Sequence, residues 1–271
     1  MTRLTDNDLT GLVEGLKEYD RDLREKTGST LLGLAARATG LAEDEAARII
    51  SGKKVGVLSL SAGGGVIPGF SHSLAAIAAH MGFETLAPSP PDALGLAELV
   101  AWDVELILSA DDHFFGAYNL TNGRVIDNRA ATGLGFAVAL DAMSGGMAGR
   151  NVLVMGCGPV GLSAARACRS MGASLSLYDI QPNKSKATAR LVEGTWIETD
   201  PRLGGTHYDL IIEATPAPDV IDSDLITGDT FVAAPGVPLG VTPEALAVLG
   251  KRIVHDPLQI GVAVMLLMAL A

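Results

Sequence analysis

The chain contains 271 residues, of which 48% are hydrophobic and 19% charged, and its formal net charge is −11. This composition predicts a folded protein with a sizeable core and argues against disorder. The acidic balance excludes nucleic acid as a partner, because such binding requires clustered lysine and arginine, but it is compatible with a cationic substrate. The two cysteines, Cys157 and Cys168, supply neither a disulfide framework nor a Cys/His cluster, so no metal site is expected.

The amino-terminal residues 1–52 are predicted to form a helical segment. They begin with MTRLTDNDLTGL, which is charged and lacks the apolar stretch of a signal peptide. Thr5 is a candidate cap for a first helix that ends near Gly28, and a second helical stretch is expected over about residues 29–51.

Residues 53–140 are predicted to form a small α/β domain that would carry a substrate site. Glycine-rich or helix-like stretches separate three apolar runs that are typical of buried strands. These runs are residues 55–60, 83–88 and 104–110. Alternation of strands and helices implies a parallel sheet with right-handed crossovers.

Residues 141–271 repeat this alternation and predict a Rossmann domain with a doubly wound parallel sheet. The expected strands lie in the segments NVLVMG, SLSLYD, YDLIIEATP, TFVAAPG and RIVHDP. The last segment, IGVAVMLLMALA, is apolar but shorter than the roughly 20 residues that cross a bilayer. It therefore predicts a buried terminal helix, packed in this domain or back on the preceding one, in a cytoplasmic protein without a membrane partner.

A dinucleotide-binding fingerprint follows the first strand of the predicted Rossmann domain. Gly156, Gly158 and Gly161 form the pattern GxGxxG, with Pro159 and Val160 before the third glycine. The first glycine permits a tight turn, the second leaves room for a pyrophosphate, and the third permits close packing of helix and strand. The amino terminus of the helix then offers free N–H groups to phosphate.

An acid at the end of the next strand favours NAD as the cofactor. Asp179, followed by Ile180, is placed to accept hydrogen bonds from both ribose hydroxyls and to repel a 2′-phosphate. Lys184 and Lys186 lie nearby and leave NADP as an alternative. Three later turns that follow strands are also expected to line the cofactor site, and they contain Thr215 and Pro216, Pro235 and Gly236, and Asp256.

Two adjacent aspartates end the third predicted strand, in the stretch ILSADDHFF. Asp111 and Asp112 should emerge at the carboxyl edge of the sheet, where open α/β sheets place their ligands. They would either cap a following helix or hold a substrate ammonium group. His113 is a candidate proton carrier, although a lone histidine is more often structural, and no other catalytic residue is assigned.

Several motifs together resemble the PylD family of NAD-dependent enzymes that complete pyrrolysine biosynthesis. The resemblance extends from about Val55 to the end and rests on SAGGGVIPGFSHSLAAIAAHMGF, ILSADDHFFGAYNLTNGRVIDN, VLVMGCGPVG, IIEATPAP, APGVP and DPLQIG. It implies a dipeptide-like amine substrate, methylornithyl-lysine. The family oxidises the side-chain amine of the methyl-D-ornithine part, releases ammonia and closes the pyrroline ring with loss of water.

The resemblance also implies positions for substrate-binding residues. The family's substrate aspartate falls on Asp111 and its asparagine on Asn128, while a family serine falls on Ala62, next to Ser61. The departure at Ala62 puts one substrate hydrogen bond in doubt, or passes it to Ser61 or to backbone N–H groups. The first helix of the family closes over the substrate, which would give Leu4 a role in a lid.

Two other functions are compatible with the same residues. One is another NAD-dependent amino-acid or amine dehydrogenase that uses Asp111 on a smaller substrate. The other is a non-catalytic NADH-sensing module. In each case a homodimer is expected, because dimers are the commonest oligomers.

Overall fold

A computed structural model describes residues 4–203 and 205–271 and divides the chain into two compact units. The first unit contains the residues up to Asp22 together with Thr30–Ala131 and Leu258–Ala271. The second contains Leu23–Ser29 and Thr132–Pro257. Each unit is built around its own β-sheet with helices packed on it, which confirms the α/β class.

The first unit has a mixed five-stranded sheet in the order β2-β1-β3-β4-β5. Its strands are β1 (Lys54–Leu58), β2 (Glu84–Leu86), β3 (Leu106–Ala110), β4 (Phe115–Asn119) and β5 (Val125–Asp127). Strands β1, β2 and β3 are parallel, as expected, but β4 and β5 pair antiparallel to their neighbours. The prediction of a purely parallel sheet was therefore wrong for this unit.

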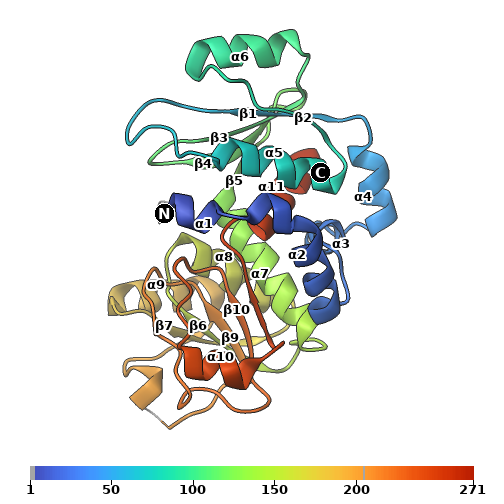
Figure 1. Cartoon of the computed structure of the whole chain (residues 1–271). Coiled ribbons are helices and arrows are strands. Elements are labelled where there is room, and N and C mark those ends of the chain that lie inside the picture. Colours follow the sequence, from blue (N-terminus) through green and yellow to red (C-terminus); the bar gives the residue numbers. More distant parts are fainter. Residues whose placement is uncertain (1–3, 204) are drawn as a thin grey trace. The chain divides into compact units, whose positions relative to one another are not determined.

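Helices cover both faces of this sheet, with α6 on one face and α5 and α11 on the other (Figure 1). The bounds are α5 (Phe70–Met81), α6 (Asp92–Ala101) and α11 (Gln259–Leu270). Helix α11 is almost wholly buried and packs on α3, α5, β4 and β5, which confirms the predicted buried terminal helix. Each helix in the described residues is too short or too polar to span a membrane.

The amino-terminal segment forms four helices where two were expected. They are α1 (Asp6–Leu9), α2 (Leu12–Thr27), α3 (Leu31–Ala38) and α4 (Glu43–Ile50). The break near Gly28 was expected. The two additional breaks fall at Gly11 and Gly40, whose φ angles are 73° and 75°. Both angles are left-handed, a conformation that glycine adopts readily and that ends a helix.

The second unit contains an entirely parallel six-stranded sheet in the order β11-β10-β9-β6-β7-β8. Its strands are β6 (Asn151–Met155), β7 (Ser174–Tyr178), β8 (Thr195–Trp196), β9 (Leu210–Glu213), β10 (Phe231–Ala234) and β11 (Ile253–His255). This order confirms the doubly wound sheet. From β6 the chain adds β7 and β8 on one side and then β9, β10 and β11 on the other, so the strand order reverses between β6 and β9. Residues 152–155 of β6 and 210–212 of β9 are continuous apolar runs because helices bury both faces of such a sheet.

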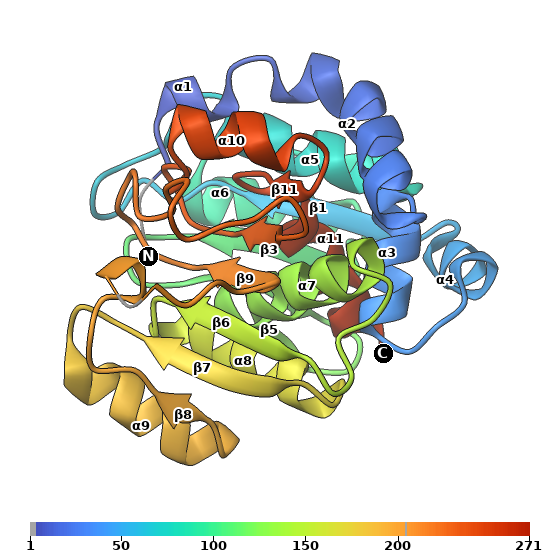
Figure 2. The same cartoon turned by 90° about the horizontal axis from the view of Figure 1, so that it is seen from below.

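The helices of the second unit connect successive strands. They are α7 (Asn128–Met143, which begins in the first unit), α8 (Pro159–Ser170), α9 (Pro182–Val192) and α10 (Pro243–Leu249), with a short 3-10 turn at Pro201–Leu203. Helix α9 lies beside β7 and β8 at the outer edge of the sheet (Figure 2).

Candidate functional site

Three loops of the first unit meet at one edge of its sheet. Strands β1 and β3 are parallel neighbours, so the segments that follow Leu58 and Ala110 emerge together. Two antiparallel pairings then return β5 to the same edge, where Asp127 lies opposite Gly116 near the start of β4. This edge therefore gathers Ser61, Asp111 and their neighbours with the first residue of α7, as the sequence motifs predicted.

Asp111 forms the turn between β3 and β4. Its Oδ1 accepts the backbone N–H groups of His113 at 2.7 Å and Phe114 at 2.8 Å. These two bonds lower the pKa of Asp111, which keeps the carboxylate ionised. The alternative that this residue caps a following helix was wrong, because the next element is strand β4. Among the described residues, Oδ2 of Asp111 receives no hydrogen bond, so it is available to a ligand.

Asp112 has a different partner, the glycine-rich loop after β1. Its Oδ2 accepts the N–H of Gly64 at 2.8 Å. Gly63 has a φ of 66°, and a side chain at that position would overlap the Asp112 carboxylate. The contact therefore fixes the loop against the β3–β4 turn.

Ser61, in the same loop, is held by the first residue of α6. Both its hydroxyl and its N–H donate to the Asp92 carboxylate, and these bonds lower the pKa of Asp92. The neighbouring Ala62 is exposed. The Ser61 hydroxyl donates to Asp92 and keeps its acceptor lone pairs.

Asn128 supplies an unpaired acceptor at this edge. Its Oδ1 is buried and has no hydrogen-bond partner among the described residues. On either side of it, Arg129 and Asp127 form a two-pronged ion pair with distances of 2.5–2.9 Å. Buried polar atoms are nearly always satisfied, so this oxygen indicates a ligand or an ordered water.

The other predicted residues of this unit have no such contacts. The side chain of His113 is exposed beside Asp111, and its backbone N–H forms the turn already described. Leu4 lies just before α1 and is half-buried.

In the second unit, the glycine fingerprint has the geometry that a dinucleotide requires. Gly156 has a φ of 88°, and a side chain at Gly161 would overlap the carbonyl oxygen of Gly156. By contrast, a Cβ at Gly158 would meet no atom within 4 Å. Helix α8 begins at Pro159, so the N–H groups of its first turn have no partner within the helix. Open space beside free N–H groups fits a pyrophosphate.

Asp179 follows β7 and reaches back to the fingerprint. Its carboxylate accepts the N–H of Cys157 at 2.8 Å and that of Gln181 at 2.8 Å. Burial, followed by the charge of Asp179, raises the pKa of the Cys157 thiol to about 12, so this thiol stays protonated. The next residue, Ile180, is 86% exposed.

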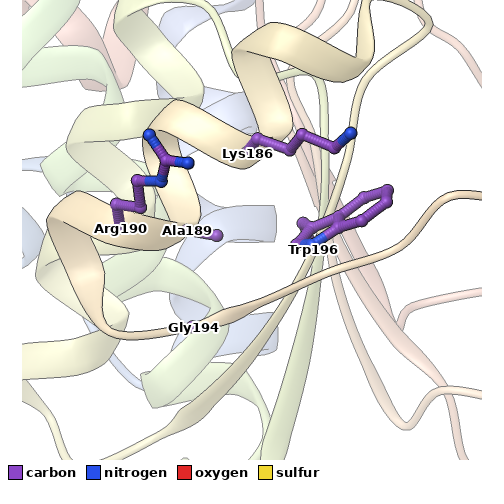
Figure 3. Close-up of a pocket in the computed structure, with 5 residues that line it drawn as sticks. All are labelled: Lys186, Ala189, Arg190, Gly194 and Trp196. Carbon is purple, nitrogen blue, oxygen red and sulfur yellow. The ribbon is translucent and has the colours of Figure 1, made fainter.

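Lys186, one of the two lysines that left NADP as an alternative, is turned toward a tryptophan. Figure 3 shows the Lys186 side chain above the Trp196 ring, with Nζ 4.3 Å from the ring centroid. Together with Ala189, Arg190 and Gly194 these side chains line a hollow of about 350 Å³ between α9 and β8. A cation–π contact of this kind gives the ammonium a role separate from a 2′-phosphate.

The three later turns do follow strands, as predicted. Thr215 and Pro216 come after β9, and Pro235 and Gly236 come after β10. Asp256 follows β11 and is 4% exposed.

Two buried polar residues were missed by the sequence reasoning. Glu213 at the end of β9 and Gln259 at the start of α11 each have a buried side-chain oxygen without a hydrogen-bond partner among the described residues. A single acid within the apolar run LIIEA was a signal for Glu213. Gln259 stands in the DPLQIG motif, but nothing in its neighbours distinguished it.

Comparison with known proteins decides the family. The model of the "Pyrrolysine biosynthesis protein PylD, N-terminal domain" matches residues 8–126. The pyrrolysine synthase of Methanosarcina acetivorans is 31% identical over 268 residues, which cover 98% of each chain. That of Methanosarcina barkeri is 30% identical and covers 98% of this chain and 97% of its own. The chain belongs to the pyrrolysine synthase family.

The second half of this family member is of a dehydrogenase type. The model of the "Alanine dehydrogenase/PNT, C-terminal domain" matches residues 129–253. A shikimate 5-dehydrogenase from Thermus thermophilus, solved with NADP(H) and shikimate, superimposes with a TM-score of 0.51 at 18% identity, covering 78% of this chain and 90% of its own. A quinate dehydrogenase from Corynebacterium glutamicum, solved with NAD, gives 0.53 at 14% identity, covering 81% and 93%. These two structures share the fold, and family and fold together indicate an oxidoreductase.

Proposed function

We propose that this protein is a pyrrolysine synthase that oxidises methylornithyl-lysine. The side-chain amine of the methyl-D-ornithine part loses a hydride and a proton and becomes an imine. Water hydrolyses the imine to an aldehyde with release of ammonia. The α-amine of the ornithine part then attacks the aldehyde, and loss of one water closes the pyrroline ring.

The observation that carries this proposal is similarity to two pyrrolysine synthases along nearly the whole chain. The edge of the first sheet supports it chemically. Asp111 offers an ionised carboxylate with Oδ2 available, which suits a substrate ammonium group. The unpaired Oδ1 of Asn128 adds a neutral acceptor that suits a second N–H of the substrate.

We further propose NAD as the cofactor, held by the glycine fingerprint. When bound, the oxidised nicotinamide accepts the hydride. Gly158 leaves room for the pyrophosphate, and the first turn of α8 supplies donors to it. Asp179, which follows β7, would bind the ribose hydroxyls and repel a 2′-phosphate, while Lys186 contacts Trp196.

The first unit positions the substrate and supplies no dedicated acid for the cyclisation. Ring closure joins two groups of one molecule, so holding the chain in a bent conformation provides most of the advantage. Asp111 would anchor one amine while the other remains free to react. Asp112 would act indirectly, through the loop that it fixes at Gly64.

The test is a direct assay with NAD and synthetic methylornithyl-lysine. We expect NADH absorbance to appear together with ammonia and a product of the mass of pyrrolysine. The NAD preference is measured by comparing kcat/KM for NAD and NADP. NADH binding without turnover of this substrate would reject the proposed reaction and favour a different amine substrate or an NADH sensor.

A further inference from the structure

A buried acid lies at the centre of the second unit's sheet. Glu213 is the last residue of β9, its side chain is 0% exposed, and it pairs with Met155 at the end of β6. The two strands are neighbours at the point where the strand order of the sheet reverses. Buried glutamates are rare unless paired, and Glu213 forms no ion pair with any residue that the structure describes.

One oxygen of this carboxyl group organises the turn after β9. Oε1 accepts the Thr215 N–H at 2.8 Å and the Thr215 hydroxyl at 2.6 Å. Gly240 packs against the same carboxyl group, because a Cβ on Gly240 would lie 2.7 Å from Cδ of Glu213. Oε2 has no hydrogen-bond partner among the described residues, and a Cβ on Gly236 would lie 2.5 Å from it.

The same turn packs directly on the glycine fingerprint. A Cβ on Gly156 would lie 2.5 Å from the carbonyl oxygen of Ala214 and 3.1 Å from Cγ2 of Thr215. A side chain on Gly236 would overlap the carbonyl oxygen of Thr215. Glu213 therefore braces one turn that touches both the fingerprint and the loop after β10.

We propose that Glu213 is a positioning residue whose protonated carboxyl group braces these loops for the dinucleotide, so that cofactor binding takes up a proton. This inference rests on the proposed nicotinamide cofactor. Loss of the proton would place an uncompensated negative charge behind the turn and weaken its packing on the fingerprint.

The surroundings of Glu213 favour this coupling. Burial raises its pKa to about 7, against the hydrogen bonds from Thr215. Cys157 after β6, Asp219 after β9 and His255 on β11 are titratable side chains on adjoining segments. A pyrophosphate brought to the fingerprint adds negative charge nearby, which raises the pKa further and recruits a proton near neutral pH.

The test is calorimetry of NADH binding by the full chain near pH 7, in two buffers with different ionisation enthalpies. We expect the apparent enthalpy to differ between buffers, as proton uptake requires. NADH fluorescence should show Kd rising by about tenfold between about pH 6 and pH 8.5, as a one-unit rise in pKa on binding would give. Both effects should disappear in Glu213→Gln, which keeps an oxygen acceptor for Thr215.

Glu244→Gln is the matched control, because Glu244 is an exposed acid of the same unit. It should reproduce the wild-type pH dependence. NADH binding whose proton uptake is the same in wild type and Glu213→Gln would overturn the role of Glu213 and leave the cofactor assignment intact. A protein that binds no NADH at any pH would overturn both.

Discussion

At the scale of single residues, neighbouring aspartates with the same sequence environment have different contacts. Asp111 uses one oxygen to form the β3–β4 turn and leaves the other available. Asp112 uses its side chain to hold the loop at Gly64. We therefore propose that a substrate amine contacts Asp111, while Asp112 fixes the position of the loop.

Substitution of each aspartate by asparagine separates these roles. Asp111→Asn keeps an acceptor for the turn but removes the charge, so we expect kcat/KM for the amine substrate to fall by roughly 10²–10³-fold, as loss of a charge-assisted bond of about 3–4 kcal/mol would give. NAD affinity should stay unchanged. The measurements are steady-state kinetics and NADH fluorescence titration.

Asp112→Asn is the matched variant. It keeps an oxygen that can accept the Gly64 N–H, so we expect a fall in kcat/KM of about tenfold or less. Equal losses in the two variants, or an equal loss of NAD affinity in Asp111→Asn, would contradict the assignment of Asp111 as the amine anchor.

The residues that the sequence predicted have strong local signals, whereas Glu213 has only a weak one, a single acid in an apolar run, and Gln259 has none. The spacing of Gly156, Gly158 and Gly161 is a property of one turn, so the sequence alone identifies it. Glu213 is significant because of what surrounds it after folding, namely Thr215 and the segment at Gly236–Gly240. Burial by distant segments leaves no local pattern.

At the scale of elements, the turn between β6 and α8 uses its glycines for two separate purposes. A Cβ at Gly158 would point into open space, and the φ of −73° suits any residue. A Cβ at Gly161 would overlap the backbone of Gly156. Gly158 therefore leaves space for a ligand, and Gly161 is required by the fold.

Alanine substitutions test this division. Gly158→Ala should leave the free energy of unfolding within about 0.5 kcal/mol of wild type while NADH affinity falls by about tenfold or more, because the methyl group occupies the space of the pyrophosphate. Gly161→Ala should lower the free energy of unfolding by roughly 1–3 kcal/mol. Urea unfolding and NADH fluorescence are the measurements. Unchanged affinity in Gly158→Ala would argue that phosphate does not bind at this turn.

The sequence failed to predict strands β4 and β5. Strand β5 has three residues, Val125–Asp127, which is too few for a period of two to be recognised. Strands β4 and β5 are nevertheless joined through Asn122–Gly123, a dipeptide typical of hairpin turns, and Gly123 has a φ of 72°. That signal was available and would have predicted the antiparallel pair.

At the scale of the whole molecule, the two units combine segments that are far apart in the chain. Helix α11, the last element, belongs to the first unit, where the Asn119 side chain donates to the Ala269 carbonyl oxygen at 2.9 Å. Its continuous apolar sequence predicted burial because every face is covered. The sequence did not predict which segments cover α11, because an apolar run indicates burial but not the elements that bury it.

Stability of the folded molecule should depend on pH through Glu213. Its pKa rises from 4.5 to about 7 on folding, so between these values the native state binds more protons than the unfolded state. The free energy of unfolding should therefore fall as pH rises from about 4.5 to about 7, by roughly 3 kcal/mol at about 1.4 kcal/mol per pKa unit. The contribution is constant above and below this window.

Urea unfolding of wild type and Glu213→Gln across this window measures the effect without any ligand. As pH rises, the free energy of unfolding of Glu213→Gln should increase relative to that of wild type, because glutamine carries no charge to desolvate. Glu244→Gln should follow wild type throughout. A constant difference between wild type and Glu213→Gln would mean that folding does not change the pKa of Glu213, so its carboxyl group would be ionised in the folded protein near neutral pH. The proton that we assign to its carboxyl group would then be absent before the cofactor binds.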